Sequence, residues 1–270
     1  MRHPRPVLLS LLLTPFLASL AALPAHADWP SDPTVNVPVC TAAEAQQMPK
    51  SCPDGSGGVI VTWYDYRGDG SNSDIYVQRI DRDGVPRWTA NGLAVCTATG
   101  GQVDPCICPD GSGGALIAWV DYRGSTLDIY VQRVEASGLI RWTTDGVALC
   151  TASYNQYSPR ICPDGTGGAI VTWYDVRSNT TYDVYARRVN AHGAPDWTAN
   201  GVVISTAAND QMYPEVVTDG AGGAIVAWVD ERSGTSDVYA QRVNSTGAVR
   251  WTANGVALCT AAGEQGQIDM

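Results

Sequence analysis

The sequence predicts an all-β fold made from four copies of one unit, and three observations support this prediction. The chain contains 28 Gly and 16 Pro but a single Phe and a single Lys, a balance that suits short strands and tight turns better than helices. Beyond the N-terminal segment, no stretch carries a sustained apolar period of 3.6 residues. Two sets of tryptophans recur every 55 or so residues: Trp63, Trp119, Trp173 and Trp228, and Trp88, Trp142, Trp197 and Trp251.

Each unit contains four stretches with strand character, which the third copy illustrates. The first is the short segment from Pro159 to Cys162, which precedes an Asp-Gly-x-Gly-Gly turn. The second is the apolar run from Ala169 to Tyr174, and the third extends from Asp183 to Val189. The fourth runs from Ala194 to Ile204 with a break at Asn200-Gly201. Gly and Asn separate these stretches, as expected for strands joined by turns.

A unit of four short antiparallel strands cannot bury both of its faces alone, so it must stack against its neighbours, as the blades of a β-propeller do. We therefore predict a β-propeller of four blades, although a stacked β-solenoid is an alternative. Because Thr34 to Cys40 resembles the last strand of a unit and the C-terminus ends in the same strand, we expect a ring that is incomplete or not closed. The predicted units are roughly 41–96, 97–150, 151–205 and 206–259, with 260–270 as a tail or the start of a further unit.

Residues 1–27 have the features of a signal peptide. Two arginines precede an apolar run from Val7 to Leu23, and the segment ends in Ala25-His26-Ala27, which suits signal peptidase. We expect cleavage before Asp28 and a single secreted or cell-surface domain, 28–270, that does not insert into a membrane. The formal charge of −10 and the lack of a basic cluster exclude nucleic acid and anionic membrane surfaces as partners.

The eight cysteines divide by their position in the repeat. Three occupy a first position and three a second position 12 residues later, while the fourth unit replaces both with Ser205 and Val217. This joint replacement, together with export, predicts three disulfides, each worth roughly 3 kcal/mol. Cys106 and Cys259 are left over, and the partner of Cys259 would fall just after Met270, which suggests a piece of a longer repeat protein. The predicted pairs are Cys40–Cys52, Cys96–Cys108 and Cys150–Cys162.

The repeated motif also resembles a known family. Trp63 to Arg67, Asp74 to Tyr76 and the Gly turn before Trp88 resemble secreted bacterial repeat proteins of the sialidase-like (neuraminidase-repeat) β-propeller group. The Asp-box turn of that group, Ser-x-Asp-x-Gly-x-Thr-Trp, is only approximated by Asp81 to Trp88 and is degenerate in the other units. The resemblance implies a β-propeller fold and does not extend to a catalytic site. Enzymes of the group use a Tyr/Glu nucleophilic pair, an acid Asp and three Arg, and a shared fold does not by itself supply such a site.

The Asp and Arg that follow the first Trp of each unit admit two interpretations. They could line a central channel and bind an anionic glycan, or they could bridge loop ends in every blade. Because one residue copied four times supplies no acid distinct from a base, we expect a structural role and no catalysis. The binding candidates of this set are Arg67, Arg123, Arg177 and Arg232, and their partners are Asp65, Asp121, Asp175 and Asp230.

Functional residues should instead differ from copy to copy. Tyr154 and Tyr157 lie between units and could stack on a sugar. Asp81-x-Asp83-Gly84 resembles part of a calcium loop but lacks the later ligands, so we expect a hairpin turn, no metal and no cofactor. The main residues that break the repeat are Lys50, Tyr154, Tyr157, Arg160, His192, Asp196, Glu215 and Glu231.

Together these features favour a secreted, non-enzymatic β-propeller module with a binding or structural role. The sequence does not name its partner, for which a glycan and a surface protein are the candidates. The alternative is a sialidase-like glycoside hydrolase or a truncated fragment of one. The two functions differ in the site that they need. An enzyme of this kind requires two carboxyl groups about 5 to 9.5 Å apart, or a Tyr/Glu pair, in a pocket that does not repeat around the fold.

Overall fold

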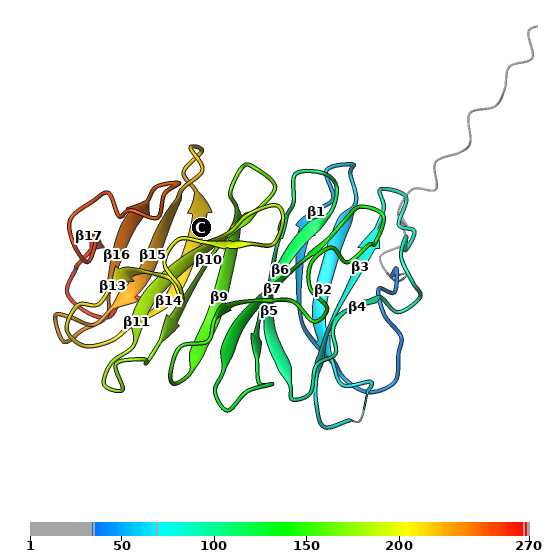
Figure 1. Cartoon of the computed structure of the whole chain (residues 1–270), viewed down its shortest axis with the longest axis horizontal. Coiled ribbons are helices and arrows are strands. Elements are labelled where there is room, and N and C mark those ends of the chain that lie inside the picture. Colours follow the sequence, from blue (N-terminus) through cyan, green and yellow to red (C-terminus); the bar gives the residue numbers. More distant parts are fainter. Residues whose placement is uncertain (1–33, 35, 69, 267, 269–270) are drawn as a thin grey trace, which may run out of the picture.

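The computed structural model describes residues 34, 36–68, 70–266 and 268. Within these residues the chain forms four antiparallel sheets and no helix, which confirms the all-β prediction (Figure 1). The absence of helices from this part of the chain also means that it contains no helical membrane span. The predicted signal peptide, residues 1–27, lies outside the described residues.

The strands follow one another in each sheet in the order of the chain, as expected for propeller blades. The first sheet contains β1 (Gln46–Pro53), β2 (Val59–Asp65), β3 (Asp74–Ile80) and β4 (Leu93–Cys96). The second contains β5 (Gln102–Pro109), β6 (Ala115–Asp121), β7 (Asp128–Val134) and β8 (Val147–Cys150). The third contains β9 (Gln156–Pro163), β10 (Ala169–Asp175), β11 (Asp183–Val189), β12 (Pro195–Asp196) and β13 (Val202–Ser205). The fourth contains β14 (Gln211–Thr218), β15 (Ala224–Asp230), β16 (Asp237–Val243) and β17 (Val256–Cys259).

The predicted fourth stretch of the third unit is divided in two. β12 and β13 both pair with β11, and the chain turns between them. The turn contains Trp197, Asn200 and Gly201, whose φ angles are 66°, 60° and 95°. These angles lie in the left-handed region and cannot continue an extended strand.

The hydrophobic core lies between the sheets rather than within one of them. Its buried residues form three clusters, and each cluster joins two neighbouring blades. The first Trp of the second, third and fourth blades lies fully buried in these clusters. Each blade therefore hides its apolar faces against its neighbours, as the short repeat requires.

The second Trp of each unit reaches across to the following blade. The indole N–H groups of Trp88, Trp142 and Trp197 donate hydrogen bonds to backbone carbonyls in the next Gly turn, at 3.1 to 3.3 Å. A Cβ atom on Gly193 would lie 2.6 Å from the Trp142 ring, so only glycine allows this approach. The Gly turn that resembled a degenerate Asp-box is thus a docking point for a tryptophan.

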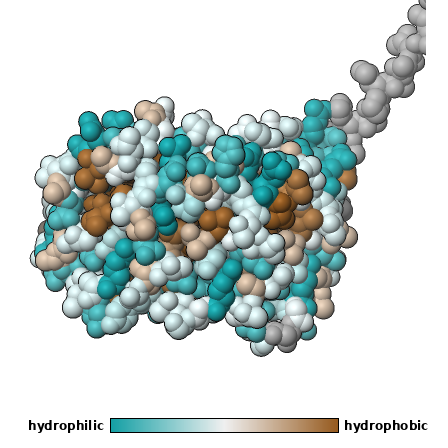
Figure 2. Space-filling model, viewed as in Figure 1, coloured by the Kyte–Doolittle hydropathy of each residue, from teal (hydrophilic) through white to brown (hydrophobic). Residues whose placement is uncertain are grey.

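The four blades form an open row. The first and fourth sheets lie at opposite ends of the molecule, so the ring is not closed (Figure 1). Apolar residues reach the surface toward both ends of this row (Figure 2). The first strands lie against one another in chain order, β1 on β5, β5 on β9 and β9 on β14, and therefore line one side of the row.

The structure corrects the disulfide prediction. All eight cysteines lie in the described part of the chain, and all are free. The thiol of Cys96 lies 3.9 Å from the carboxylate of Asp121, at one end of β6, whereas Cys108 pairs with Leu116 near its other end. Five residues of strand separate these two points, which corresponds to about 17 Å. A disulfide requires Cα atoms within about 7 Å. The same geometry overturns the predicted pairs Cys40–Cys52, Cys96–Cys108 and Cys150–Cys162.

Candidate functional site

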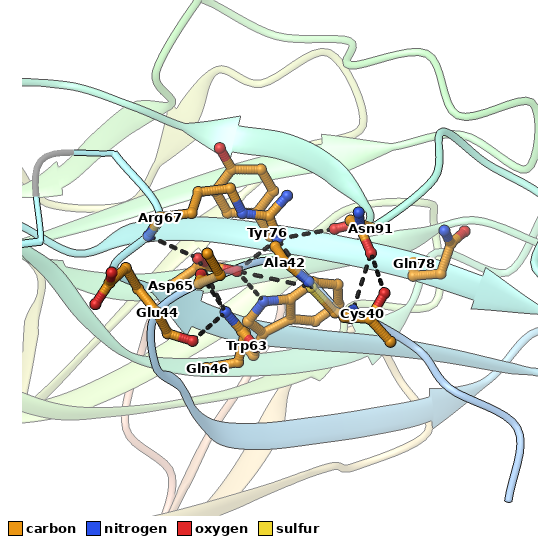
Figure 3. A network of polar contacts seen from close by, with 12 residues as sticks. Cys40, Ala42, Glu44, Gln46, Trp63, Asp65, Arg67, Tyr76, Gln78 and Asn91 are labelled. Atoms are coloured by element: carbon orange, nitrogen blue, oxygen red, sulfur yellow. Dashed lines mark hydrogen bonds and ion pairs between the residues drawn. The ribbon is translucent and has the colours of Figure 1, made fainter.

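The repeated Asp and Arg form the same network in every blade. In the first blade, the buried carboxylate of Asp65 accepts hydrogen bonds from the Trp63 indole at 2.9 Å and from the Arg67 guanidinium at 2.5 Å (Figure 3). The guanidinium also donates to the carbonyl of Asn91 at 2.8 Å and lies over the ring of Tyr76. Burial alone would raise the pKa of Asp65, but the hydrogen bonds from Arg67 and Trp63 outweigh it and lower that pKa.

The four arginines do not converge on one site. Each pairs with the Asp of its own blade at 2.5 to 2.7 Å, each lies over a Tyr ring, and their side chains are about one fifth exposed. Each guanidinium charge is thus compensated by a buried carboxylate. The network joins the end of the second strand to the turn before the outer strand. Binding of an anionic glycan by Arg67, Arg123, Arg177 and Arg232 stays a prediction.

A second repeated feature lies on the first strand of each blade. There the register of pairing with the second strand shifts by a β-bulge, at an x-Pro step. The residue before the proline has a φ of about 50° in all four blades. This φ lies in the left-handed region, which is unfavourable for residues other than glycine. Bulges of this kind are common next to functional sites because they redirect side chains. The four residues are Met48, Asp104, Ser158 and Tyr213.

The residues on either side of these prolines differ in every blade, in contrast to the constant scaffold. The position after the proline carries Lys50, Cys106, Arg160 and Glu215 in turn. Burial raises the pKa of Asp104, and the positive charges of Arg160 and Lys50 oppose that rise. Arg160 donates to the Glu215 carboxylate across the junction of blades three and four, at 2.7 Å. Charges of alternating sign, Lys50, Asp104, Arg160 and Glu215, therefore follow one another along the first strands.

We call this series of charges the charge row. Its Arg160–Glu215 end borders a cavity of about 440 Å³. It contains three of the residues that break the repeat: Arg160, Glu215 and Glu231. The exposed Tyr213 also lines it, so that a phenol, a guanidinium and two carboxylates share one concave surface. No other described blade combines these groups in this way. The remaining lining residues are Met212, Val229, Ser236, Gly266 and Ile268.

Aromatic rings adjoin the cavity. Tyr213 contacts Tyr174 edge to face, with ring centroids 5.6 Å apart, and Tyr157 stacks on Tyr174 at 5.5 Å. Burial raises the pKa of Tyr174 to about 12, so its hydroxyl stays neutral. Tyr157 is thus connected to the site through Tyr174, whereas Tyr154 is exposed outside this cluster.

The other candidates are not brought to the cavity. Lys50 is exposed on β1, at the far end of the charge row. His192 lies in the Gly turn that receives Trp142, and Asp196 lies on β12. Sequence reasoning missed Tyr213 and Asp104. The signal that could have found them is the x-Pro step at the same place in each unit, with a different x in each.

No protein-family model matches the chain, and no curated protein matches its sequence. Solved structures do resemble its fold. An α-L-arabinanase from Penicillium chrysogenum aligns with a TM-score of 0.51 and 14% identity, over 83% of this chain and 71% of the arabinanase. An endo-arabinase from Bacteroides thetaiotaomicron aligns with a TM-score of 0.46 and 13% identity, over 83% of this chain and 78% of the endo-arabinase. The Hadza microbial sialidase Hz136 aligns with a TM-score of 0.49 and 13% identity over 79% of this chain. This chain spans about half (47%) of the length of the sialidase. The alignment with the arabinanase shows that the chain has a β-propeller fold.

Proposed function

We propose that this protein is an exported β-propeller module that binds a neutral carbohydrate on the inner side of its third and fourth blades. The observation that carries the proposal is the clustering of Arg160, Glu215 and Tyr213 beside a cavity, on a scaffold that otherwise repeats. Ligand sites combine an apolar surface with a few polar groups that fix orientation. Here Met212 and Val229 supply part of the apolar surface.

The charges of the cavity favour a neutral sugar over an anionic one. One guanidinium stands against the two carboxylates of Glu215 and Glu231, and the whole chain carries a formal charge of −10. Carboxylates accept hydrogen bonds from sugar hydroxyls but repel a carboxylated sugar. An exposed tyrosine ring such as Tyr213 offers a face on which a pyranose or furanose can pack. Export rests on the sequence of residues 1–27 alone.

Hydrolysis of a glycosidic bond is the second candidate function, and one observation favours it. Glu215 and Glu231 share a cavity that is not repeated in the other blades, together with Tyr213. The Arg160 guanidinium lies 2.7 Å from the Glu215 carboxylate and orients it, so Glu215 would act as the base or nucleophile, and Glu231, the other carboxyl group of the cavity, as the acid.

Titration calorimetry against neutral arabino-, manno- and xylo-oligosaccharides and against sialyllactose tests the binding proposal. We expect a neutral oligosaccharide to bind and Glu215→Gln to weaken it tenfold or more, since hydrogen bonds to charged groups contribute about 1.5–3 kcal/mol. Glu135→Gln is the matched control, because Glu135 forms an exposed ion pair with Arg141 in another blade. Tyr213→Ala should abolish binding, while Tyr154→Ala should not. Failure of every neutral sugar to bind, or equal effects of the two glutamate variants, would contradict the proposal.

Release of reducing sugar separates binding from hydrolysis. Product formation that Glu231→Gln abolishes, with sugar affinity unchanged, would establish the enzyme. Binding of an oligosaccharide without release of reducing sugar would establish a non-enzymatic binding module.

A further inference from the structure

One position near the end of the second strand alternates between tyrosine and valine from blade to blade. It carries Tyr64 on β2 and Tyr174 on β10, but Val120 and Val229 on β6 and β15. Tyr174 belongs to the aromatic group beside the proposed sugar cavity, where it contacts Tyr213. The first blade therefore has a tyrosine at the place that corresponds to the edge of that cavity.

The next blade packs in the same way at both places. β5 lies against β1 and β2, as β14 lies against β9 and β10. On β14 the residue before the proline, Tyr213, contacts Tyr174. On β5 the residue before the proline is Asp104. Burial, then the neighbouring Tyr66 and Asp104, raise the pKa of Tyr64, so the Asp104 carboxylate lies near the Tyr64 hydroxyl. Tyr66 contacts Tyr64 edge to face, with ring centroids 5.9 Å apart, and an aromatic pair therefore lies beside Asp104.

The Asp104 carboxylate has no close partner. In the part of the chain that the structure describes, it accepts no hydrogen bond and forms no ion pair, whereas each Asp of the repeated network is paired with an arginine. Asp104 has a φ of 50° and lies at a β-bulge, a backbone conformation that costs free energy and is common at binding sites. Burial raises its pKa, and the more distant charges of Arg160 and Lys50 oppose that rise. The bulge therefore presents a carboxylate that is available to accept hydrogen bonds from a ligand.

The groups at this junction suit a neutral sugar. Tyr66 is partly exposed, so its ring offers a face on which the C–H groups of a sugar can pack. Asp104 is partly exposed and accepts hydrogen bonds from hydroxyls, and the exposed Lys50 donates them to sugar oxygens. Because one cation and one anion leave no net charge, the junction does not favour a charged sugar.

We propose that Tyr66, Asp104 and Lys50 form a second sugar subsite between the first and second blades, so that the ligand is an oligosaccharide that extends along the charge row to the cavity. This inference rests on the proposed function, because it assigns the same class of neutral sugar to both places. β9, which carries Arg160, lies between β5 and β14 and continues the polar surface from one place to the other. The two places are two blades apart, about 20 Å, since packed sheets lie about 10 Å apart. A disaccharide is too short to reach both.

Titration calorimetry of the full chain with arabinobiose and arabinohexaose, and with the manno- and xylo-oligosaccharides of the same two lengths, tests this proposal. We expect the hexaose to bind at least tenfold more tightly than the biose. Asp104→Asn should weaken hexaose binding about tenfold or more and leave biose binding unchanged, because it removes a charged acceptor from the second subsite alone. Asn adopts a positive φ readily, so the variant should fold. Asp145→Asn is the matched control, because Asp145 lies in the same blade and the other three units carry Asn at its position.

Tyr66→Ala should also weaken hexaose binding alone, whereas Tyr122→Ala, at the equivalent position of the second blade, should not. Equal affinities for hexaose and biose, or a hexaose affinity that Asp104→Asn leaves unchanged, would overturn the second subsite. The cavity is tested separately, because Glu215→Gln should weaken binding of both lengths. A loss for Asp104→Asn without a loss for Glu215→Gln would support the second subsite and contradict the proposed cavity, and binding of neither length would overturn both proposals.

Discussion

Replacement of the leucine at one position of the repeat, in two different units, tests whether the core lies at the blade junctions. Leu149 and Leu258 are equivalent in sequence, but Leu149 is fully buried between the second and third blades while Leu258 is 60% exposed. Replacing Leu by Ala removes three carbon-sized groups, worth about 2.4 kcal/mol of transfer free energy. The cavity left at a buried site adds to this loss, so Leu149→Ala should lower the free energy of unfolding by about 2–5 kcal/mol.

Leu258→Ala should cost far less. With roughly two fifths of its surface buried and no cavity created, the expected loss is about 1 kcal/mol or less. Urea denaturation followed by tryptophan fluorescence measures the difference. A loss of 3 kcal/mol corresponds to a midpoint shift of roughly 1 M. Equal losses for Leu149→Ala and Leu258→Ala would refute the assignment of the core to the junctions.

Four further predictions follow from the scaffold. Gly193→Ala should destabilise the protein by more than Gly165→Ala, because both glycines have positive φ angles but only at Gly193 would a Cβ meet a Trp ring, and unfolding in urea measures the difference. Asp121→Ala should cost about 3–5 kcal/mol in the same assay, since it leaves the buried part of the Arg123 charge and the Trp119 indole unpaired, and a loss below 1 kcal/mol would contradict the network. Burial, reinforced by Asp175, raises the pKa of Asp183 to about 6, so between about pH 4 and pH 6 the folded state holds a proton there that the unfolded state has released. The wild type should therefore lose stability relative to Asp183→Asn, by up to about 3 kcal/mol in total, as the pH rises from about 3 to 7, and a difference independent of pH would contradict this. Titration of the denatured, unreduced protein with a thiol reagent should find eight thiols, with Cys259 reacting first in the native state, whereas two thiols would restore the three disulfides.

The cysteine prediction failed for a reason that the sequence could not reveal. Cys96 and Cys108 recur together, which is what a bonded pair requires, but they recur because both belong to one repeated junction. The Cys96 thiol contacts the Asp121 and Arg123 network of the following blade, while Cys108 lies at the opposite end of the first strand. Separation along the chain was short and separation in space was long, since an extended strand lies between them.

The candidate site was found in part. The search for residues that break the repeat identified Arg160, Glu215 and Glu231, which do share a cavity. Identity between copies favoured a structural role for the four arginines, and each of them pairs with its own Asp. Binding of an anionic glycan by these arginines stays a prediction. Tyr213 was missed because its exposure depends on the bulge before Pro214, and a bulge is a property of pairing between two strands.

The sequence by itself determined the repeat, the four strands of each unit and the positions of the Gly turns, because these depend on local conformational preferences and on a pattern that recurs in every copy. Only the tertiary structure decided which faces are covered, which cysteines are apart and which differing residues meet. Those outcomes depend on how one blade is placed on the next, and the placement follows from packing between residues about 50 positions apart. The same distinction applies to the fourth blade: Leu258 occupies the same position of the repeat as Leu149, yet Leu258 is 60% exposed whereas Leu149 is fully buried.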